Sequence, residues 1–252
     1  MQQGEELAGK VALVTGGARN IGRAIARDLA AGGAAVMVNV NTSVEMAQET
    51  VAMIEDTGGQ AAYHVADVTQ PDAVDALVKA TVERFGRVDF LVNNAGIRHE
   101  TPLEEMTYEQ WRSVLSVIVD AAFLCTSAVL PHMIEAGGGT IINIGGMTGH
   151  SGAKHRAHLI TGKAAIAGMT KAFALDLAEH GITVNCVAPG MIVTVRGLPG
   201  APLRPASRSA PPPIGHLGRM EDISSMVRML CGPDGHYITG QTIHINGGAL
   251  MP

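Results

Sequence analysis

A chain of 252 residues with 46% hydrophobic residues and few aromatics is long enough for one large core of helices packed on a buried sheet. The net charge of -5, without blocks of like charge, argues against nucleic-acid and anionic-membrane binding, and we expect no apolar run to cross a bilayer. The three cysteines show no metal-ligand spacing, and the first residues lack the basic and apolar regions of a secretory signal, so we expect no metal and a cytoplasmic location.

The first predicted elements surround a glycine-rich turn at residues 15–22. A β-branched apolar run over 10–14 breaks at Thr15-Gly16, and from Ile21 onward apolar residues recur at helical spacing. The glycines at 16, 17 and 22 permit positive φ and close backbone approach, while the helix start offers free N–H groups to an anion. Strand, turn and helix in this order predict a site for a dinucleotide pyrophosphate.

The second predicted strand, residues 34–40, ends without the acidic residue that binds the adenosine ribose hydroxyls in NAD-dependent enzymes. Asn39 and the four residues after it carry no carboxylate. Arg19, in the first turn, is either a solvated loop charge or a partner for a 2′-phosphate. The combination favours NADP(H) over NAD(H).

Helices and strands then alternate along the chain. The next helix is predicted over 44–57, and another begins after Thr69 as its N-cap and runs to residue 85. The later predicted helices cover 108–136, 157–179 and 221–230, and the later strands cover 60–68, 88–92, 140–144, 182–187 and 242–246. This alternation predicts an α/β protein with a parallel, doubly wound sheet.

Four motifs together carry a family resemblance. The turn at 15–22, Asp67-Val68, Asn93-Asn94-Ala95-Gly96 and Pro189-Gly190 resemble, in order and spacing, the short-chain dehydrogenase/reductase family over essentially the whole chain. The resemblance implies a single Rossmann domain over 1–252, with a mostly parallel seven-stranded sheet, helices on both faces, a nicotinamide cofactor, and a homotetramer or homodimer. Asn20 stands where the family usually has glycine, and because asparagine tolerates left-handed geometry we expect the turn to survive.

The same resemblance assigns residues to the cofactor. They are Gly16, Arg19, Asn20, Ile21, Gly22, Asn39, Asp67, Val68, Asn93, Ala95, Gly96, Lys163, Pro189, Gly190, Ile192 and Thr194. It also implies that the Pro- and Gly-rich segment 191–218 covers a small-molecule substrate, since a structureless stretch of this length in a compact domain is often a binding lid.

The usual catalytic set of the family is incomplete in this chain. In that set a Tyr protonates the carbonyl oxygen, a Ser orients it, and a Lys lowers the pKa of the Tyr and holds the nicotinamide ribose beside an Asn. The Asn position falls on Ile118, the Ser position on Gly146 and the Tyr position on Leu159, which leaves Lys163 as the one catalytic residue we assign. The three tyrosines of the chain all lie in other predicted elements. The sequence therefore predicts an atypical member without the usual proton donor.

The missing donor favours one class of hydride acceptor. A ketone develops an alkoxide as hydride arrives, whereas a protonated imine is already cationic and is neutralised by hydride. We therefore interpret the chain as an NADPH-dependent reductase of C=N, or of an unusually activated C=O or C=C, in a small apolar substrate. The expected substrate pocket contains Gly146, Met147, Thr148, Leu159 and Met191.

Two other functions stay open. The first is a carbonyl reductase or alcohol dehydrogenase with a replacement acid. The candidate acids are His150, His155, Arg156 and His158, followed by Thr148 and Asp120. His158 precedes Leu159 and points about 100° away from it around the helix. The second is a cofactor-binding protein with little turnover.

Overall fold

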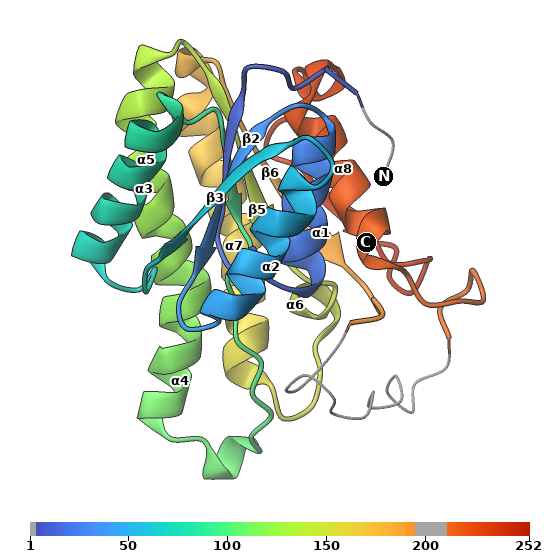
Figure 1. Ribbon diagram of the computed structural model, residues 1–252. Coiled ribbons are helices and arrows are strands. Elements are labelled where there is room, and N and C mark those ends of the chain that lie inside the picture. The colour runs from blue at the N-terminus through green and yellow to red at the C-terminus, as the bar shows by residue number, and fades with distance from the viewer. Residues whose placement is uncertain (1–3, 195–210) are drawn as a thin grey trace.

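The computed structural model describes residues 4–194 and 211–252, and its centre is one seven-stranded sheet (Figure 1). The strand order is β3-β2-β1-β4-β5-β6-β7, and every neighbouring pair is parallel. The strands are β1 (Val11–Val14), β2 (Ala35–Val40), β3 (Gln60–Val65), β4 (Phe90–Asn93), β5 (Gly139–Ile144), β6 (Ile182–Pro189) and β7 (Thr242–Ile245). The order reverses between β1 and β4, which is where an open α/β sheet places its ligand.

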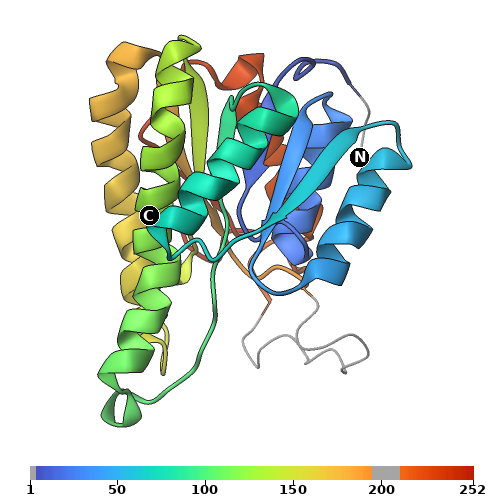
Figure 2. The same cartoon turned by 60° about the vertical axis from the view of Figure 1, so that its left-hand side comes forward.

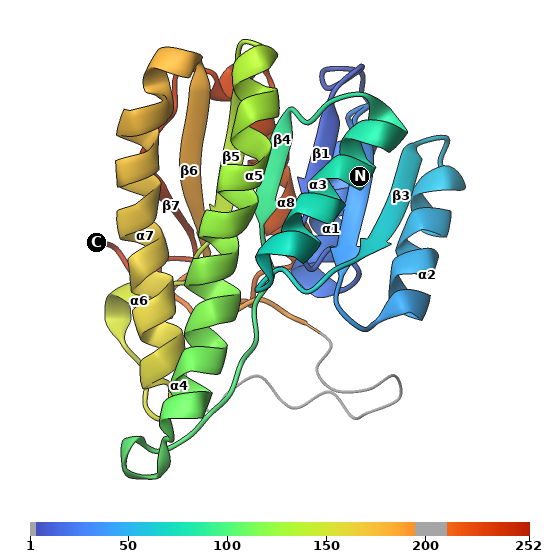
Figure 3. The same ribbon diagram turned by 90° about the vertical axis from the view of Figure 1, so that its left-hand side faces the viewer.

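Helices cover both faces of the sheet, as Figures 2 and 3 show. They are α1 (Asn20–Ala31), α2 (Val44–Glu55), α3 (Pro71–Phe85), α4 (Tyr108–Leu115), α5 (Ala121–Glu135), α6 (Thr148–Ser151), α7 (Ala157–Leu177) and α8 (Met220–Cys231). One buried cluster packs α1, α2 and α8 against the sheet, and a second packs α3, α5 and α7 against its other face. The predicted doubly wound Rossmann fold is therefore confirmed.

The long helix predicted over 108–136 is interrupted by a π turn at Ser116–Asp120. The turn joins α4 to α5 and holds Ile118, which is only 3% exposed. A Cβ added at Gly162 of α7 would lie 3.1 Å from the Ile118 side chain. The π turn therefore seats an apolar residue against α7 close to the carboxyl end of the sheet.

One predicted helix start is wrong. Thr69 does not cap α3, because the N-cap residue is Gln70 and the helix begins at Pro71. The Thr69 hydroxyl and backbone amide instead donate to Asp67 Oδ1, at 2.8 and 3.0 Å. A short local turn after β3 thus uses the hydroxyl that the sequence pattern assigned to the helix.

The span Tyr108–Glu135 is long and apolar enough to cross a membrane by length and composition, which the sequence analysis did not expect. The criterion is also met by core helices of soluble proteins, and 39% of its most apolar window is buried. Its sheet-facing residues Cys125, Val129 and Met133 lie in the core cluster of α3, α5 and α7. The span is thus in part a core element of this fold.

The segment expected to cover the substrate is described at its two ends only. Ile192 and Gly218 form an isolated parallel bridge, with Val193 N–H donating to Gly218 O at 2.8 Å and Gly218 N–H to Met191 O at 3.0 Å. The ends of the segment are therefore held together. The part of the predicted lid over 195–210 lies outside the described residues.

Candidate active site

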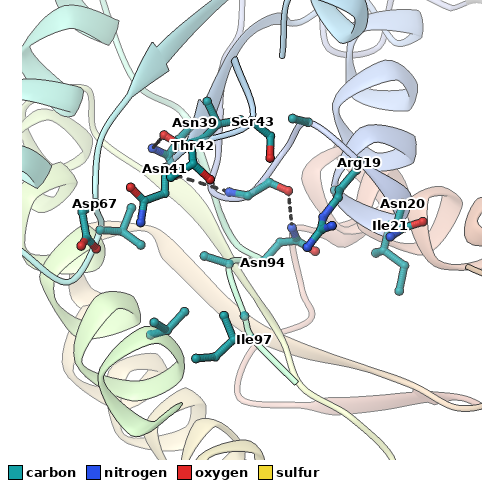
Figure 4. A pocket seen from close by; sticks show the side chains of 18 of the residues that line it. Arg19, Asn20, Ile21, Asn39, Asn41, Thr42, Ser43, Asp67, Asn94 and Ile97 are labelled. Atoms are coloured by element: carbon teal, nitrogen blue, oxygen red, sulfur yellow. Dashed lines mark hydrogen bonds between the residues drawn. The ribbon is translucent and has the colours of Figure 1, made fainter. Parts of the chain in front are cut away.

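A cleft of about 470 Å³ opens at the carboxyl ends of β1, β2 and β4, at the reversal of strand order (Figure 4). Its walls are the end of β2, the loops that follow β1, β2 and β4, residues 66–68 after β3, the start of α1, Val117 and Thr194. Of the residues predicted to bind the cofactor, those lining the cleft are Gly16, Arg19, Asn20, Ile21, Gly22, Asn39, Asp67, Val68, Ala95, Gly96 and Thr194.

The turn after β1 depends on left-handed backbone and close approach. Gly16 has φ +60° and Asn20 has φ 49°, so asparagine does adopt the left-handed geometry expected of it. A Cβ added at Gly22 would lie 2.3 Å from Gly16 O and 2.5 Å from Asn94 Nδ2. Glycine at 22 is therefore required for α1 to start this close to the turn.

The start of α1 is suited to an anion. Its N-cap residue, Arg19, makes no side-chain capping bond, and the first turn holds no acidic residue. Ile21 and Gly22 at this end line the cleft. The positive end of the helix dipole and the first-turn amides therefore fit the pyrophosphate of a dinucleotide.

Asn94 is a site residue that the sequence analysis missed. Its Nδ2 donates to Thr15 O at 2.9 Å and Gly16 O at 3.0 Å, and it lines the cleft (Figure 4). Asn93, which was predicted instead, turns into the core, where its Nδ2 donates to Asn143 Oδ1 at 2.9 Å. Adjacent residues at a strand end point to opposite sides, and the paired asparagines gave no signal of which faces the cleft.

Asn39 lines the cleft, but its side-chain amide forms hydrogen bonds with backbone groups. Its Nδ2 donates to Ala66 O at 3.0 Å, and its Oδ1 accepts from Gly16 N–H at 3.4 Å. Asn41, Thr42 and Ser43 follow at the same wall of the cleft. Among the described lining residues Asp67 carries the single carboxylate, so this wall lacks the acidic group that would oppose a 2′-phosphate.

Lys163 lies in a narrow recess beside the cleft. The recess shares Ala95 and Val117 with the cleft and is also lined by Ile118 and Ile144. Lys163 Nζ donates to Ile144 O at 2.5 Å, at the carboxyl end of β5. Burial lowers the pKa of this ammonium to about 8, partly offset by the nearby Cys186 thiol.

The predicted substrate residues come from three neighbouring segments. Gly146 follows β5, and a Cβ added there would lie 3.7 Å from Lys163 Cγ, an ordinary contact. Met147 N–H donates to Pro189 O at 2.9 Å, which brings the segment after β5 against the end of β6, shortly before Met191. Thr148 begins α6. Leu159 lies one helical turn before Lys163 and packs against the buried cluster of Ile118.

Three further predicted cofactor residues lie away from the cleft walls. Gly190 N–H donates to Ile245 O at 2.9 Å, and a Cβ there would lie 2.5 Å from Asn246 Cβ, so this glycine serves the approach of β6 to the end of β7. Pro189 ends β6, and Ile192 packs on the cluster of α1 and α8. They support the loop that carries Thr194 to the cleft.

Three of the four candidate acids around α6 and α7 contact other residues. His150 stacks edge-on against His244, with ring centroids 4.7 Å apart, and Arg156 pairs with Glu100. His158 is fully buried, and its Nδ1 accepts a hydrogen bond from Leu159 N–H. It lies four residues before Gly162 and therefore on the same face of α7, which packs against Ile118. The exposed His155 carries a φ of 59°. In the described part of the chain, none of the four lines the cleft or the Lys163 recess.

Comparisons with known proteins agree with this architecture. A family model described as enoyl-(acyl carrier protein) reductase matches residues 16–249. The 3-oxoacyl-[acyl-carrier-protein] reductase of Synechocystis sp. is 41% identical over 248 residues, which cover 97% of this chain and 98% of that protein. The chain belongs to the short-chain dehydrogenase/reductase family. It is therefore an oxidoreductase of the NAD(P)-dependent kind.

Further relatives of this short-chain dehydrogenase/reductase extend the comparison. The 3-oxoacyl-[acyl-carrier-protein] reductase FabG of Vibrio cholerae is 40% identical, over 97% of this chain and 99% of that one. A crystal structure of a dehydrogenase/reductase from Sinorhizobium meliloti 1021 has a TM-score of 0.90 at 40% identity and covers 96% of both chains. A blue fluorescent protein from a metagenomic library, solved in complex with NADPH, has a TM-score of 0.89 at 36% identity, over 98% and 100%.

Proposed function

We propose that this short-chain dehydrogenase/reductase is an atypical member that reduces C=N in a small apolar substrate with NADPH. The observation that carries the proposal is Leu159. It occupies the place that the family resemblance gives to the Tyr proton donor, one turn before Lys163, and packs with Ile118 in an apolar cluster. Gly146, at the place of the family's Ser, brings no hydroxyl.

This arrangement suits a substrate that is cationic when hydride arrives. NADPH, when bound, supplies a hydride. A protonated C=N accepts hydride at carbon and becomes a neutral amine, so no oxyanion requires a hydroxyl donor. The apolar side chains of Leu159 and Ile118 give such a substrate a dry wall, and Lys163 keeps the role of holding the nicotinamide ribose.

The proposal is tested by comparing the rates at which the protein reduces cyclic imines and the matching ketones. Faster reduction of the ketones would favour a second candidate function, carbonyl reduction. Carbonyl reduction is favoured by the names of the Synechocystis and Vibrio relatives, which are 3-oxoacyl-[acyl-carrier-protein] reductases. That reaction requires a replacement acid for the alkoxide in this chain. We do not transfer the acyl-carrier-protein substrates of these relatives to this chain, and we propose a small apolar molecule as its substrate.

The preference for NADPH over NADH belongs to this proposal. It is supported by Arg19 at the cleft, by the carboxylate-free wall at residues 39–43, and by the NADPH complex of one structural relative. We also keep the expectations of a cytoplasmic location and of a homotetramer or homodimer. The exposed apolar side chains of Phe123 on α5 and Leu175 on α7, 52% and 82% exposed, support an assembly.

Arg19→Ala is expected to raise the KM for NADPH by about tenfold or more, because a charge-assisted bond to phosphate contributes roughly 1.5–3 kcal/mol. The KM for NADH should change less, since NADH has no 2′-phosphate. Steady-state kinetics with both cofactors measure this, and Arg27→Ala, later on the same helix and away from the cleft lining, is the matched control. Equal increases for the two cofactors would contradict the 2′-phosphate assignment.

A further inference from the structure

The Lys163 side chain reaches from α7 to the carboxyl end of the sheet. Its side chain runs from the second turn of α7 past Gly146 to the carboxyl end of β5, where Nζ meets Ile144 O. None of the ion pairs found between described residues includes Lys163. Its ammonium is therefore held by a neutral carbonyl, which leaves further N–H bonds for another acceptor.

The recess around Lys163 adjoins the cofactor cleft. The two share Ala95 and Val117, and the other recess walls near the lysine are Ile118 and Ile144. Of its polar neighbours, the Thr15 hydroxyl donates to Val92 O and Asn93 Nδ2 donates to Asn143, while the buried Asn93 Oδ1 has no hydrogen-bond partner among the described residues. Among the described residues of this recess, Lys163 alone carries a proton that can ionise near neutral pH.

Burial, with no ion pair among the described residues to offset it, favours the neutral form of Lys163. Burial lowers its pKa to about 8, and the Cys186 thiol on β6 acts in the opposite direction. On the other elements packed against α7, His150 of α6 is exposed, Asp120 of the π turn pairs with Arg112, and Glu109 of α4 is exposed. A group with a pKa close to the working pH is the most effective general acid.

We propose that Lys163 itself donates the proton that activates the substrate, in place of the missing tyrosine. This inference rests on the proposed C=N reduction and names its proton source. An N–H bond of the Lys163 ammonium breaks, its electron pair stays on Nζ, and the proton forms an N–H bond with the imine nitrogen. NADPH, when bound, would supply the hydride that the imine carbon accepts to give the amine, and the neutral Lys163 regains a proton from water.

The test compares a neutral cyclic imine with its N-methyl iminium salt, which carries its charge permanently and needs no proton. The assay uses saturating NADPH and a pH at which the imine is weakly protonated in solution. In Lys163→Met and in Lys163→Arg, the ratio of kcat/KM for imine to kcat/KM for iminium should fall at least tenfold. Arginine is the informative variant, because it keeps a cation for the ribose but is too weak an acid.

The pH profile and a direct titration complete the test. The wild-type rate on the neutral imine should fall as pH rises through about 8, because the donating form of Lys163 is lost, while the rate on the iminium should not. The chain has five lysines, at 10, 79, 154, 163 and 171, so NMR of ¹³C-labelled lysine can follow each one. The signal missing from Lys163→Met should titrate near 8 rather than at the ordinary value of 10.5.

Each contrary result has its own meaning. Equal losses on imine and iminium in both variants would show that Lys163 only holds the cofactor, and a titration near 10.5 would equally overturn the proton-donor role. Absence of turnover on both substrates would contradict the proposed function instead. The NMR titration would then still measure the pKa of Lys163, because it does not depend on turnover.

Discussion

Leu159→Tyr combined with Gly146→Ser is expected to raise ketone reduction by about 10²–10⁴-fold, the usual contribution of a positioned general acid. Reduction of cyclic imines should not rise, because Lys163 already supplies the proton to a neutral C=N and a cationic C=N gains little from a hydroxyl donor. The structure has room for the pair: a Cβ at residue 146 meets Lys163 Cγ at 3.7 Å, and Leu159 is only partly buried. Steady-state rates of NADPH oxidation on matched ketones and imines measure both effects.

Leu159→Phe with Gly146→Ser is the matched control for this prediction. It adds the ring without the phenolic hydroxyl, so any ketone activity that depends on the proton donor should be absent from it. A large gain on imines in the tyrosine variant would show that a donor was limiting there too. That result would remove the chemical reason for assigning this enzyme to C=N reduction.

Gly22→Ala is expected to weaken NADPH binding at least tenfold and to lower the free energy of unfolding by about 1–3 kcal/mol. The added Cβ would lie 2.3 Å from Gly16 O, a backbone atom that cannot yield without moving the turn. The turn and the start of α1 are the anion site, so their displacement removes amides from the pyrophosphate. Fluorescence titration with NADPH and thermal denaturation measure the two effects.

Gly168→Ala is the control for the glycine prediction. Gly168 lies inside α7, and nothing lies within 4 Å of a Cβ added there. Alanine should leave NADPH affinity unchanged and stabilise the helix by roughly 0.5–1 kcal/mol, because glycine is a poor helix former. An unchanged affinity in Gly22→Ala would mean that the cofactor does not use this turn.

The fold was predictable because its signals are local. The break at Thr15-Gly16 and the alternation of apolar strands with helical spacing depend on nearest neighbours along the chain, and they gave the parallel sheet and the cleft at its carboxyl edge. The left-handed Asn20 was predictable for the same reason, since few residues other than glycine tolerate that φ.

The details of the site depend on tertiary contacts, and these were harder to predict. The exchange of roles between Asn93 and Asn94 is decided by which side chain meets Asn143 and which meets the turn. The π turn at Ser116–Asp120 adds a residue to a helix whose apolar pattern continues unbroken. The low pKa of Lys163 follows from burial, which no sequence spacing reveals.

The most direct measurement is NADPH and NADH consumption, followed by absorbance, on paired panels of cyclic imines and the matching ketones. Turnover of imines alone, with NADPH preferred, is the expected result. Turnover of ketones at comparable rates would contradict it and would turn attention to a replacement acid. Tight NADPH binding with no turnover on either panel would also contradict it, and would favour a cofactor-binding protein.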